Sequence, residues 1–268
     1  MSAQAKLHQV VTFSTDPLRG NPAFVLSGVH DASDRVLALT CTMLGADVVA
    51  VVGDRQDNVT PLRFFTANGP HAGPGHATLA AAHIVLREGL VAGGPIMFRL
   101  PNGDDRAAYV DGDRIYVDFP TMPGSRVERI AEMEAALGVR PQETWVAPFG
   151  YVAIYDERDA IAGMKPDLAR VAAFDRTAVI VTAPGGDMAD IVIRVFAPNV
   201  GLPEDPVCGT AHRIIVPYWA GKFGKTKIHS RQLSPRGGDL WCEDKGKTVL
   251  IGGETVRVIA GTIRLPKT

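Results

Sequence analysis

Length, composition and charge already narrow the class of this protein. The chain has 268 residues, 46% of them hydrophobic, and a formal net charge of −1. It is therefore long enough for one large domain or for two half-sized domains with cores of their own. The near-neutral charge argues against nucleic-acid binding, which needs a basic surface to neutralise phosphates. No apolar run approaches the roughly 20 residues of a membrane span, so we expect no membrane partner.

The N-terminus and the cysteines indicate the compartment. The opening "MSAQAKLHQVVTF" lacks the apolar core of a signal peptide and soon becomes strand-like. The three cysteines (Cys41, Cys208 and Cys242) are odd in number and widely spaced, without a CxxC pair. That pattern disfavours a disulfide framework or a zinc cage, and it fits a reducing environment. We therefore expect a cytoplasmic protein.

In chain order, short segments rich in β-branched and aromatic residues alternate with fewer helical ones. The strand-like segments are "QVVTF", "AFVLSGV", "DVVAVVG", "PLRFFT", "IMFRL", "RIYVDFP", "TAVIVTA", "DIVIRVF", "VLIGGE" and "VRVIAGTIRL". Helices are predicted over 33–43, 76–88, 126–137, 166–174 and 210–223, the third behind Ser125 and ending at Gly138. The basic segment 222–231 is interpreted as a solvated turn. Strands and helices do not alternate strictly enough for a doubly wound parallel sheet, so the fold class is α+β.

A weak internal repeat suggests two similar halves. "PLRFFTANGPHAGPGHATLAAAHIV" and "VIRVFAPNVGLPEDPVCGTAHRIIVPYW" each contain a strand, a loop rich in Gly or Pro, and a Gly-x-Ala helix start. Gly75-His76-Ala77 aligns with Gly209-Thr210-Ala211. This predicts two lobes that each present a loop and a helix N-terminus to a shared cleft. The segment "VDFPTMPG" marks the boundary, which gives lobes 1–118 and 119–268, with the last strand able to return to the first lobe.

The two helix starts point to an acid as ligand. A helix N-terminus offers unpaired N–H groups and about half a positive charge, which attract carboxylates. His76 lies in such a first turn, where the helix dipole favours its neutral form and lets it exchange a proton. The alternative is a histidine that only caps the helix or bonds a loop.

The second loop, "PEDPVCGTAH", brings further reactive side chains close together in sequence. Asp205 is either a turn or capping residue, or a carboxylate that shares a proton with a histidine. Cys208 is either a thiol of low pKa at a helix N-terminus or a small buried residue, and the second interpretation is favoured. Glu204, Thr210 and His212 complete this group.

Taken together, these motifs resemble the phenazine-biosynthesis PhzF-like family, which has the diaminopimelate epimerase fold. The motifs are "FSTDPLRGNPAFVL", "RFFT…GHATLAAAH", "VDFP", "RVFAPNVGLPEDPVCGTAH" and "VPYWAGKFGKTKIHSRQLSPRGGDL", which cover nearly the whole chain. The resemblance implies two lobes, each a β-barrel-like roll around a central helix, with the active site in the cleft. It also implies a homodimer and proton transfer without a cofactor. Carried over by motif, the family's site residues correspond to Gly75, His76, Asp205, Gly209 and Thr210.

The first lobe departs from the family pattern. The family's proton-transferring glutamate lies in an "LSET-FV" segment, which reads "LGADVVAVV" here and has no glutamate. Asp47 is the nearest carboxylate and is one methylene shorter. Displacing such a group by about 1 Å can cost about 10²-fold in rate. Further departures are Val11 in place of an aspartate, and His71 and Pro74 in the loop before His76.

The leading hypothesis is an isomerase-type enzyme that moves a proton on a small carboxylic acid. Asp47 would act as base, provided that it is shielded from water, and His76 and Asp205 would relay or return the proton. Thr210 and the N–H groups near Gly75, Cys208 and Gly209 would bind the substrate's carboxylate. Two alternatives stay open: an epimerase or dehydratase that uses Cys208 as its single thiol, and a metabolite-binding protein that has lost the base. We expect neither a metal nor a cofactor.

Overall fold

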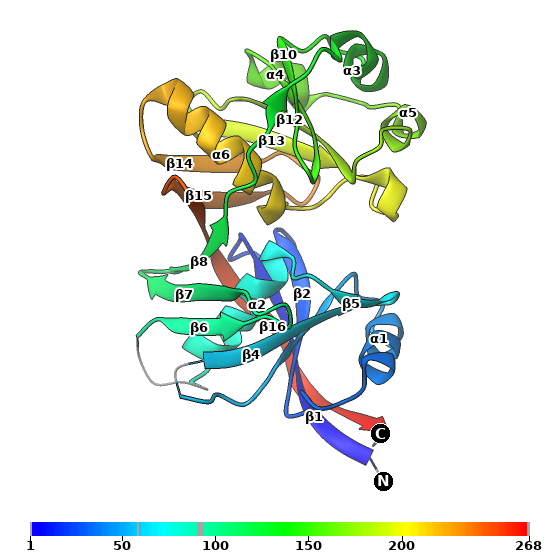
Figure 1. Cartoon of the computed structure of the whole chain (residues 1–268), viewed down its shortest axis with the longest axis vertical. Coiled ribbons are helices and arrows are strands. Elements are labelled where there is room, and N and C mark those ends of the chain that lie inside the picture. Colours follow the sequence, from blue (N-terminus) through cyan, green and yellow to red (C-terminus); the bar gives the residue numbers. More distant parts are fainter. Residues whose placement is uncertain (1, 58, 90–93, 267–268) are drawn as a thin grey trace. The chain divides into compact units, whose positions relative to one another are not determined.

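A computed structural model describes residues 2–57, 59–89 and 94–266 (Figure 1). The chain divides into two compact units. Unit 1 comprises Met1–Asp118 and Gly252–Thr268, and unit 2 comprises Phe119–Ile251. Because these boundaries fall inside β8 (Arg114–Pro120) and β16 (Thr248–Pro266), both units contain part of each of these two strands.

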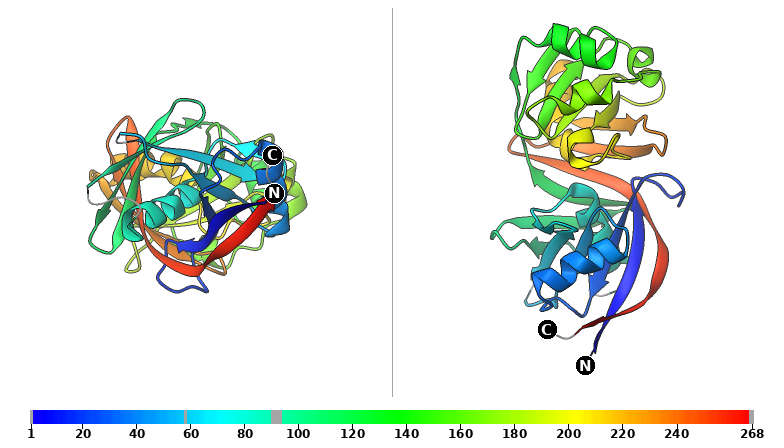
Figure 2. Two further views of the ribbon diagram at one scale, coloured as in Figure 1. Left: turned by 90° about the horizontal axis from the view of Figure 1, so that it is seen from below. Right: turned by 90° about the vertical axis from the view of Figure 1, so that its right-hand side faces the viewer.

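Unit 1 is built on a closed β-barrel. Its other strands are β1 (Ser2–Thr12), β2 (Asn21–Ser27), β3 (Val49–Val52), β4 (Val59–Thr66), β5 (Gly69–His71), β6 (Ile96–Arg99) and β7 (Asp105–Asp111). Neighbouring strands follow the order β1-β2-β3-β4-β6-β7-β8-β16, and β16 pairs again with β1, which closes the ring. Figure 2 shows β1 and β16 running side by side as a long antiparallel ribbon.

Helix α2 (Gly75–Arg87) is the central helix of unit 1. It packs against β1, β2, β3 and β7, and its residues from Ala77 to Val85 are buried without interruption. A helix that is apolar on all sides belongs in a core, and alanines at 80–82 let strands approach closely. By contrast, α1 (Asp34–Met43) is buried on one side only: Leu37 and Cys41 belong to the same apolar cluster as Val49 and Val51 of β3.

Unit 2 is a mixed sheet with helices on both faces. Its strands are β9 (Ser125–Arg126), β10 (Glu143–Val146), β11 (Gly150–Ile154), β12 (Ala178–Pro184), β13 (Ile191–Phe196), β14 (Lys227–Gln232) and β15 (Gly238–Asp244), which neighbour one another in chain order. Its helices are α3 (Ile130–Leu137), α4 (Arg158–Ala162), α5 (Leu168–Ala172), the 3-10 turn η1 (Pro198–Val200) and α6 (Gly209–Phe223). The pairs β11–β12 and β13–β14 are parallel.

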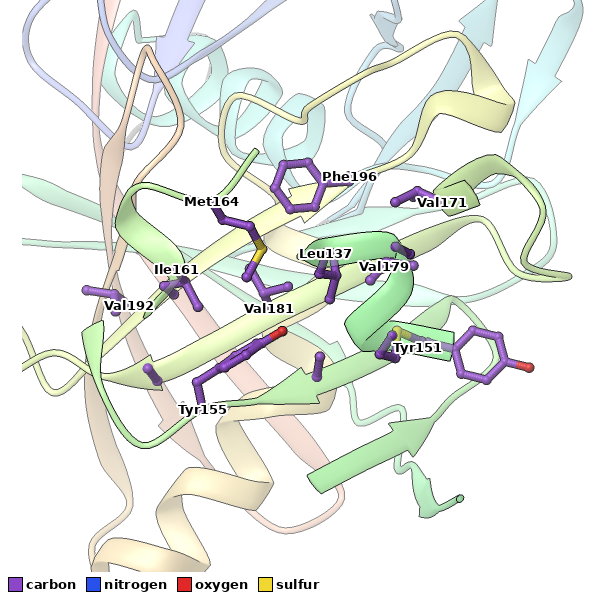
Figure 3. Close-up of a cluster of buried hydrophobic side chains, with 14 residues drawn as sticks. Leu137, Tyr151, Tyr155, Ile161, Met164, Val171, Val179, Val181, Val192 and Phe196 are labelled. Carbon is purple, nitrogen blue, oxygen red and sulfur yellow. The ribbon is translucent and has the colours of Figure 1, made fainter. Parts of the chain in front are cut away.

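The two faces of this sheet are covered differently. On one face, Leu137 of α3, Ile161 of α4 and Val171 of α5 pack with Val179 and Val181 of β12 (Figure 3). Side chains alternate along a strand, so Thr182, the residue after Val181, faces the other way. Its hydroxyl accepts a hydrogen bond from the Trp219 indole of α6 at 3.1 Å. Helix α6 therefore lies on the face opposite α3, α4 and α5.

A proline inside α6 ties this helix to the segment that follows β8. Pro217 has no N–H, so it cannot donate to the carbonyl of Arg213 four residues earlier. That carbonyl instead accepts the N–H of Met122 at 3.0 Å, and the Arg213 guanidinium donates to the carbonyl of Pro120 at 2.8 Å. The freed backbone group of the helix thus fixes residues 120–122 on α6.

Two local predictions are wrong. The helix expected over 126–137 begins only at Ile130. Residues 125–126 instead form β9, which pairs with β10, and the Arg129 N–H donates a hydrogen bond to the Thr144 hydroxyl at 3.1 Å. The segment 222–231 is not a solvated turn. It contains the end of α6 and most of β14, in which Ile228, Ser230 and Gln232 are buried alternately.

Candidate functional site

The loop before α2 provides no side-chain cap for the first turn of that helix. Pro74 is the N-cap residue and its side chain makes no capping hydrogen bond, while its carbonyl accepts the Thr78 hydroxyl at 3.0 Å. Gly73 has a φ of +104°, and a Cβ there would lie 2.8 Å from the ring of Phe64. The loop therefore requires glycine at this position, and the first-turn N–H groups of α2 have no side-chain cap.

His76 occupies this first turn as a half-buried side chain. Burial lowers its pKa to about 4, and the positive charge of His71 contributes to the same shift. Among the residues that the structure describes, none forms a side-chain hydrogen bond with the His76 imidazole. The ring is thus neutral near pH 7 and has no fixed partner, so it can accept a proton from a ligand.

The other histidine of α2 differs in this respect. Nδ1 of His83 lies 2.7 Å from the Thr255 hydroxyl, and its Nε2 lies 3.6 Å from Glu88. Burial also lowers the pKa of His83 to about 4. Because its ring already has partners in unit 1, His83 is a packed core histidine.

Asp47 does not meet the condition set for a base. Its side chain is exposed, whereas the sequence hypothesis required a carboxylate shielded from water. It lies just before β3, and its negative charge, second to burial, raises the pKa of the Cys41 thiol on α1. Cys41 and the outward-facing Val49 and Val51 share the apolar cluster under α1. Asp47 is therefore on the α1 side of β3, whereas His76 belongs to the helix inside the barrel.

In unit 2, an ion pair anchors the start of the loop before α6. Both carboxylate oxygens of Glu204 accept hydrogen bonds from Arg194 of β13, at 2.8 and 2.9 Å. The same guanidinium donates to the carbonyls of Ile161 and Met164, at 3.1 and 2.7 Å. With its carboxylate engaged in this way, Glu204 serves as an anchor and is not a free acid or base.

The backbone of the next residues is held by hydrogen bonds as well. The Asp205 N–H donates to the carbonyl of Val195 at 2.9 Å, and the Ser234 hydroxyl donates to the carbonyl of Pro206 at 2.5 Å. The side-chain amide of Gln232 bonds the carbonyl of Asp205 at 2.6 Å and the N–H of Cys208 at 2.8 Å. These bonds fix the backbone of the loop that leads into α6.

Asp205 and Cys208 interact directly at the start of α6. Burial raises the pKa of the Cys208 thiol well above its ordinary value, and the negative charge and hydrogen bond of the Asp205 carboxylate add to this effect. Cys208 is therefore a protonated thiol at neutral pH and not the reactive thiolate of the alternative hypothesis. Gly209 is buried behind it, and Thr210 is half-buried in the first turn of α6.

His212 fixes the same turn from inside. It is fully buried, its Nδ1 lies 2.8 Å from the carbonyl of Cys208, and its Nε2 lies 2.8 Å from the Ser230 hydroxyl. Burial lowers its pKa to about 4. A neutral ring that donates from Nδ1 and accepts at Nε2 satisfies both bonds, which makes His212 a structural residue of α6.

Sequence reasoning missed Gln232, Ser234 and Arg194, although the first two lie in the quoted "RQLSPRGG" segment. The available signal is a polar residue at two of the three buried positions of β14, Ser230 and Gln232, which alternate with Arg231. Among the described residues, no three His, Cys, Asp or Glu side chains gather as a metal site would require. Within the same residues, no helix is both long and apolar enough to span a membrane.

Comparison with known proteins agrees with this architecture. Residues 10–261 match the family model described as phenazine biosynthesis-like protein. An uncharacterized isomerase of Pseudomonas aeruginosa is 36% identical over 262 residues, which are 98% of this chain and 99% of that protein. A crystal structure of a phenazine biosynthesis protein of the PhzF family from Enterococcus faecalis has a TM-score of 0.91 at 31% identity, covering 98% of this chain and 99% of that one.

A more distant likeness concerns the fold alone. A hydroxyproline epimerase from Agrobacterium vitis, crystallised with trans-4-hydroxy-L-proline, has a TM-score of 0.63 at 12% identity. The match covers 98% of this chain and 93% of the epimerase chain. The α+β fold with a closed barrel is thus shared with epimerases, and the relatives named above include an isomerase. On the match over 10–261 and the 36% identity, this chain belongs to the phenazine biosynthesis-like family.

Proposed function

We propose that this protein is a cofactor-independent isomerase that moves a proton on a small carboxylic acid by histidine and carboxylate acid–base chemistry. The observation that carries this proposal is the state of His76. Its imidazole is neutral, with a pKa of about 4, and makes no side-chain hydrogen bond to any residue that the structure describes. Near neutral pH this imidazole carries no proton and has no side-chain partner, so it can take up a proton from a substrate carbon, as a weaker base than an ordinary histidine.

The substrate's carboxylate would bind to N–H groups at a helix start. The N–H groups of the first turns, at Gly75 in α2 and at Gly209 in α6, are the groups for which an acid would compete. The N-cap residue of α2, Pro74, makes no capping hydrogen bond there. Such N–H groups would also stabilise negative charge that develops on the carboxylate when the neighbouring carbon loses its proton.

Asp205 is proposed as the second proton-exchanging group. Its carboxylate is half-buried beside Cys208, and its backbone is fixed on both sides. His76 would take the proton and Asp205 would return or relay it at another carbon. Thr210, half-buried in the same first turn, would contact the substrate through its hydroxyl. Asp47 is left out of this scheme because its side chain is exposed on the α1 side of β3.

The test is proton NMR in D₂O with a panel of small carboxylic acids, among them cyclic and unsaturated acids and α-amino acids. We expect carbon-bound deuterium to appear in at least one of them with the wild-type chain, and to disappear with His76→Gln. Deuterium that enters equally fast with both chains would show that His76 is not the group that moves the proton.

The exposure of Asp47 also favours a second candidate, a metabolite-binding protein without catalysis. In that case the family's glutamate has been lost, and no carboxylate shielded from water takes its place at Asp47. Calorimetry would then detect binding of a carboxylic acid while the NMR experiment shows no deuterium in the same compound. Deuterium incorporation into a bound acid would exclude this candidate.

A further inference from the structure

Gln232 connects β14 to the loop that carries Asp205. It is the last residue of β14, and only 1% of it is exposed. Its Nε2 donates to the carbonyl of Asp205 at 2.6 Å, and its Oε1 accepts the N–H of Cys208 at 2.8 Å. A single buried amide thus bonds the backbone on both sides of Pro206 and Val207.

The chemistry of the loop requires a side chain of this kind. Pro206 has no N–H, and the N–H of Cys208 precedes the helix and has no partner within α6. The Asp205 carbonyl and the Cys208 N–H both lie outside the helical hydrogen bonds of α6, in a part of the chain where Val207 and Cys208 are buried. An amide supplies one donor and one acceptor on a rigid plane, and only one orientation of Gln232 satisfies both groups.

We infer that Gln232 is a positioning residue that holds the Asp205 carboxylate and the first turn of α6 in the geometry needed for proton transfer. This inference rests on the proposed function, because it concerns the same site. Asp205 is fixed through its N–H by Val195 and through its carbonyl by Gln232, so its side chain leaves the backbone in a set direction. A displacement of about 1 Å at such a group can cost about 10²-fold in rate.

The test compares two buried substitutions that each remove one donor and one acceptor. Gln232→Met keeps the length of the side chain and leaves the Asp205 carbonyl and the Cys208 N–H unpaired. The matched control is Thr182→Val, because the Thr182 hydroxyl donates to the Val192 carbonyl at 2.9 Å and accepts from Trp219 of α6 at 3.1 Å, away from the loop. Both variants are expected to unfold at lower urea concentration than the wild type.

Two readouts separate positioning from general stability. In hydrogen–deuterium exchange followed by mass spectrometry, peptides covering 203–209 should exchange at least about tenfold faster in Gln232→Met and at the wild-type rate in Thr182→Val. Deuterium incorporation into the substrate should fall by about 10²-fold in Gln232→Met and by less than about threefold in Thr182→Val. Unchanged amide exchange in 203–209 would overturn the inference, as would equal losses of activity in the two variants.

A conservative variant adds a pH signature. In Gln232→Glu, the protonated carboxyl can donate to the Asp205 carbonyl and accept from the Cys208 N–H, whereas the ionised form can only accept. Activity relative to wild type should therefore be highest at low pH and fall as the introduced carboxyl ionises. A constant ratio across pH would count against the inference. If the wild type itself incorporates no deuterium, the proposed function fails, and the amide-exchange comparison alone decides whether Gln232 holds the loop.

Discussion

The Cys208 thiol forms a hydrogen bond with the Asp205 carboxylate at the start of α6. This pair decides between two interpretations of the second loop. If the thiol had a lowered pKa, Cys208 would be a candidate nucleophile or base. Instead, burial and the neighbouring negative charge raise its pKa well above the ordinary value, so the thiol acts as a hydrogen-bond donor to the carboxylate.

We therefore predict that Cys208 is dispensable for proton exchange. Iodoacetamide at pH 8 should leave the rate of deuterium incorporation unchanged, because Cys41, Cys208 and Cys242 are all buried. Cys208→Ala should keep the rate within about tenfold of wild type, since it removes one hydrogen bond to Asp205 and no reacting group. Inactivation that follows the alkylation of Cys208, identified by mass spectrometry, would restore the single-thiol mechanism.

His76→Gln should reduce proton exchange by about 10² to 10⁴-fold, which is the contribution usual for a positioned acid or base. Glutamine keeps a polar side chain but cannot take up a proton, so binding of the substrate, measured by calorimetry, should persist. His83→Gln is the matched control, because His83 lies on the same helix and bonds Thr255. It should lower stability and leave exchange within a few-fold of wild type. Equal activity losses in the two variants would argue against a special role for His76.

Asp47→Asn should leave proton exchange within about threefold of wild type, because the carboxylate is exposed and lies on the α1 side of β3. Asp205→Asn, by comparison, should cost about 10² to 10⁴-fold. The rates of both variants can be measured by the same NMR experiment. Loss of exchange in Asp47→Asn with binding intact would mean that Asp47 does replace the family's glutamate, as the sequence hypothesis held.

The sequence predicts the elements that carry Gly75 and Gly209 to within one residue, because glycine, small residues and apolar periodicity all agree there. It fails at β14, where "KIHSRQ" has only one apolar residue. This strand is stabilised by tertiary hydrogen bonds, from Ser230 to His212 and from Gln232 to the loop, and local patterns do not contain that information.

The electrostatic surroundings of the site residues are equally hard to predict from the sequence. The sequence predicts the neutral state of His76 from the helix dipole, while in the structure burial and His71 are the causes of its low pKa. Asp47 lies in the turn between α1 and β3, so its exposure depends on how that turn packs and not on a strand pattern. Side-chain identity within a motif is therefore visible in the sequence, but shielding from water is decided by packing.

The stability of the protein should decrease as the pH falls from about 6.5 to about 4. Burial lowers the pKa of His76, His83 and His212 to about 4, so between these limits the unfolded chain binds protons that the folded chain excludes. The free energy of unfolding, measured in urea at a series of pH values, should therefore be fully present above about pH 6.5 and lost progressively below it. Asp239 affects stability in a lower pH range. Despite its burial, hydrogen bonds from His229 and Arg231 bring its pKa to about 2, so its contribution to the free energy of unfolding is lost only below about pH 4. A free energy that stays constant down to pH 4.5 would contradict the expected neutral state of the three histidines.

Gly20→Ala should destabilise unit 1 more than Gly45→Ala, although both glycines have nearly the same backbone conformation, with φ of +62° and +60°. Each substitution forces a Cβ into the left-handed region, which costs about 1 kcal/mol. At Gly45 the new methyl group would meet nothing within 4 Å, whereas at Gly20 it would lie 2.3 Å from the carbonyl oxygen of Thr12.

Because this oxygen belongs to β1, which pairs with both β2 and β16, relieving the contact requires the barrel wall to shift. We expect Gly20→Ala to lower the free energy of unfolding by at least about 1 kcal/mol more than Gly45→Ala does, measured in urea at pH 7. Equal losses in the two variants would show that backbone conformation alone, and not the close approach to Thr12, requires glycine in the "LRGNP" segment.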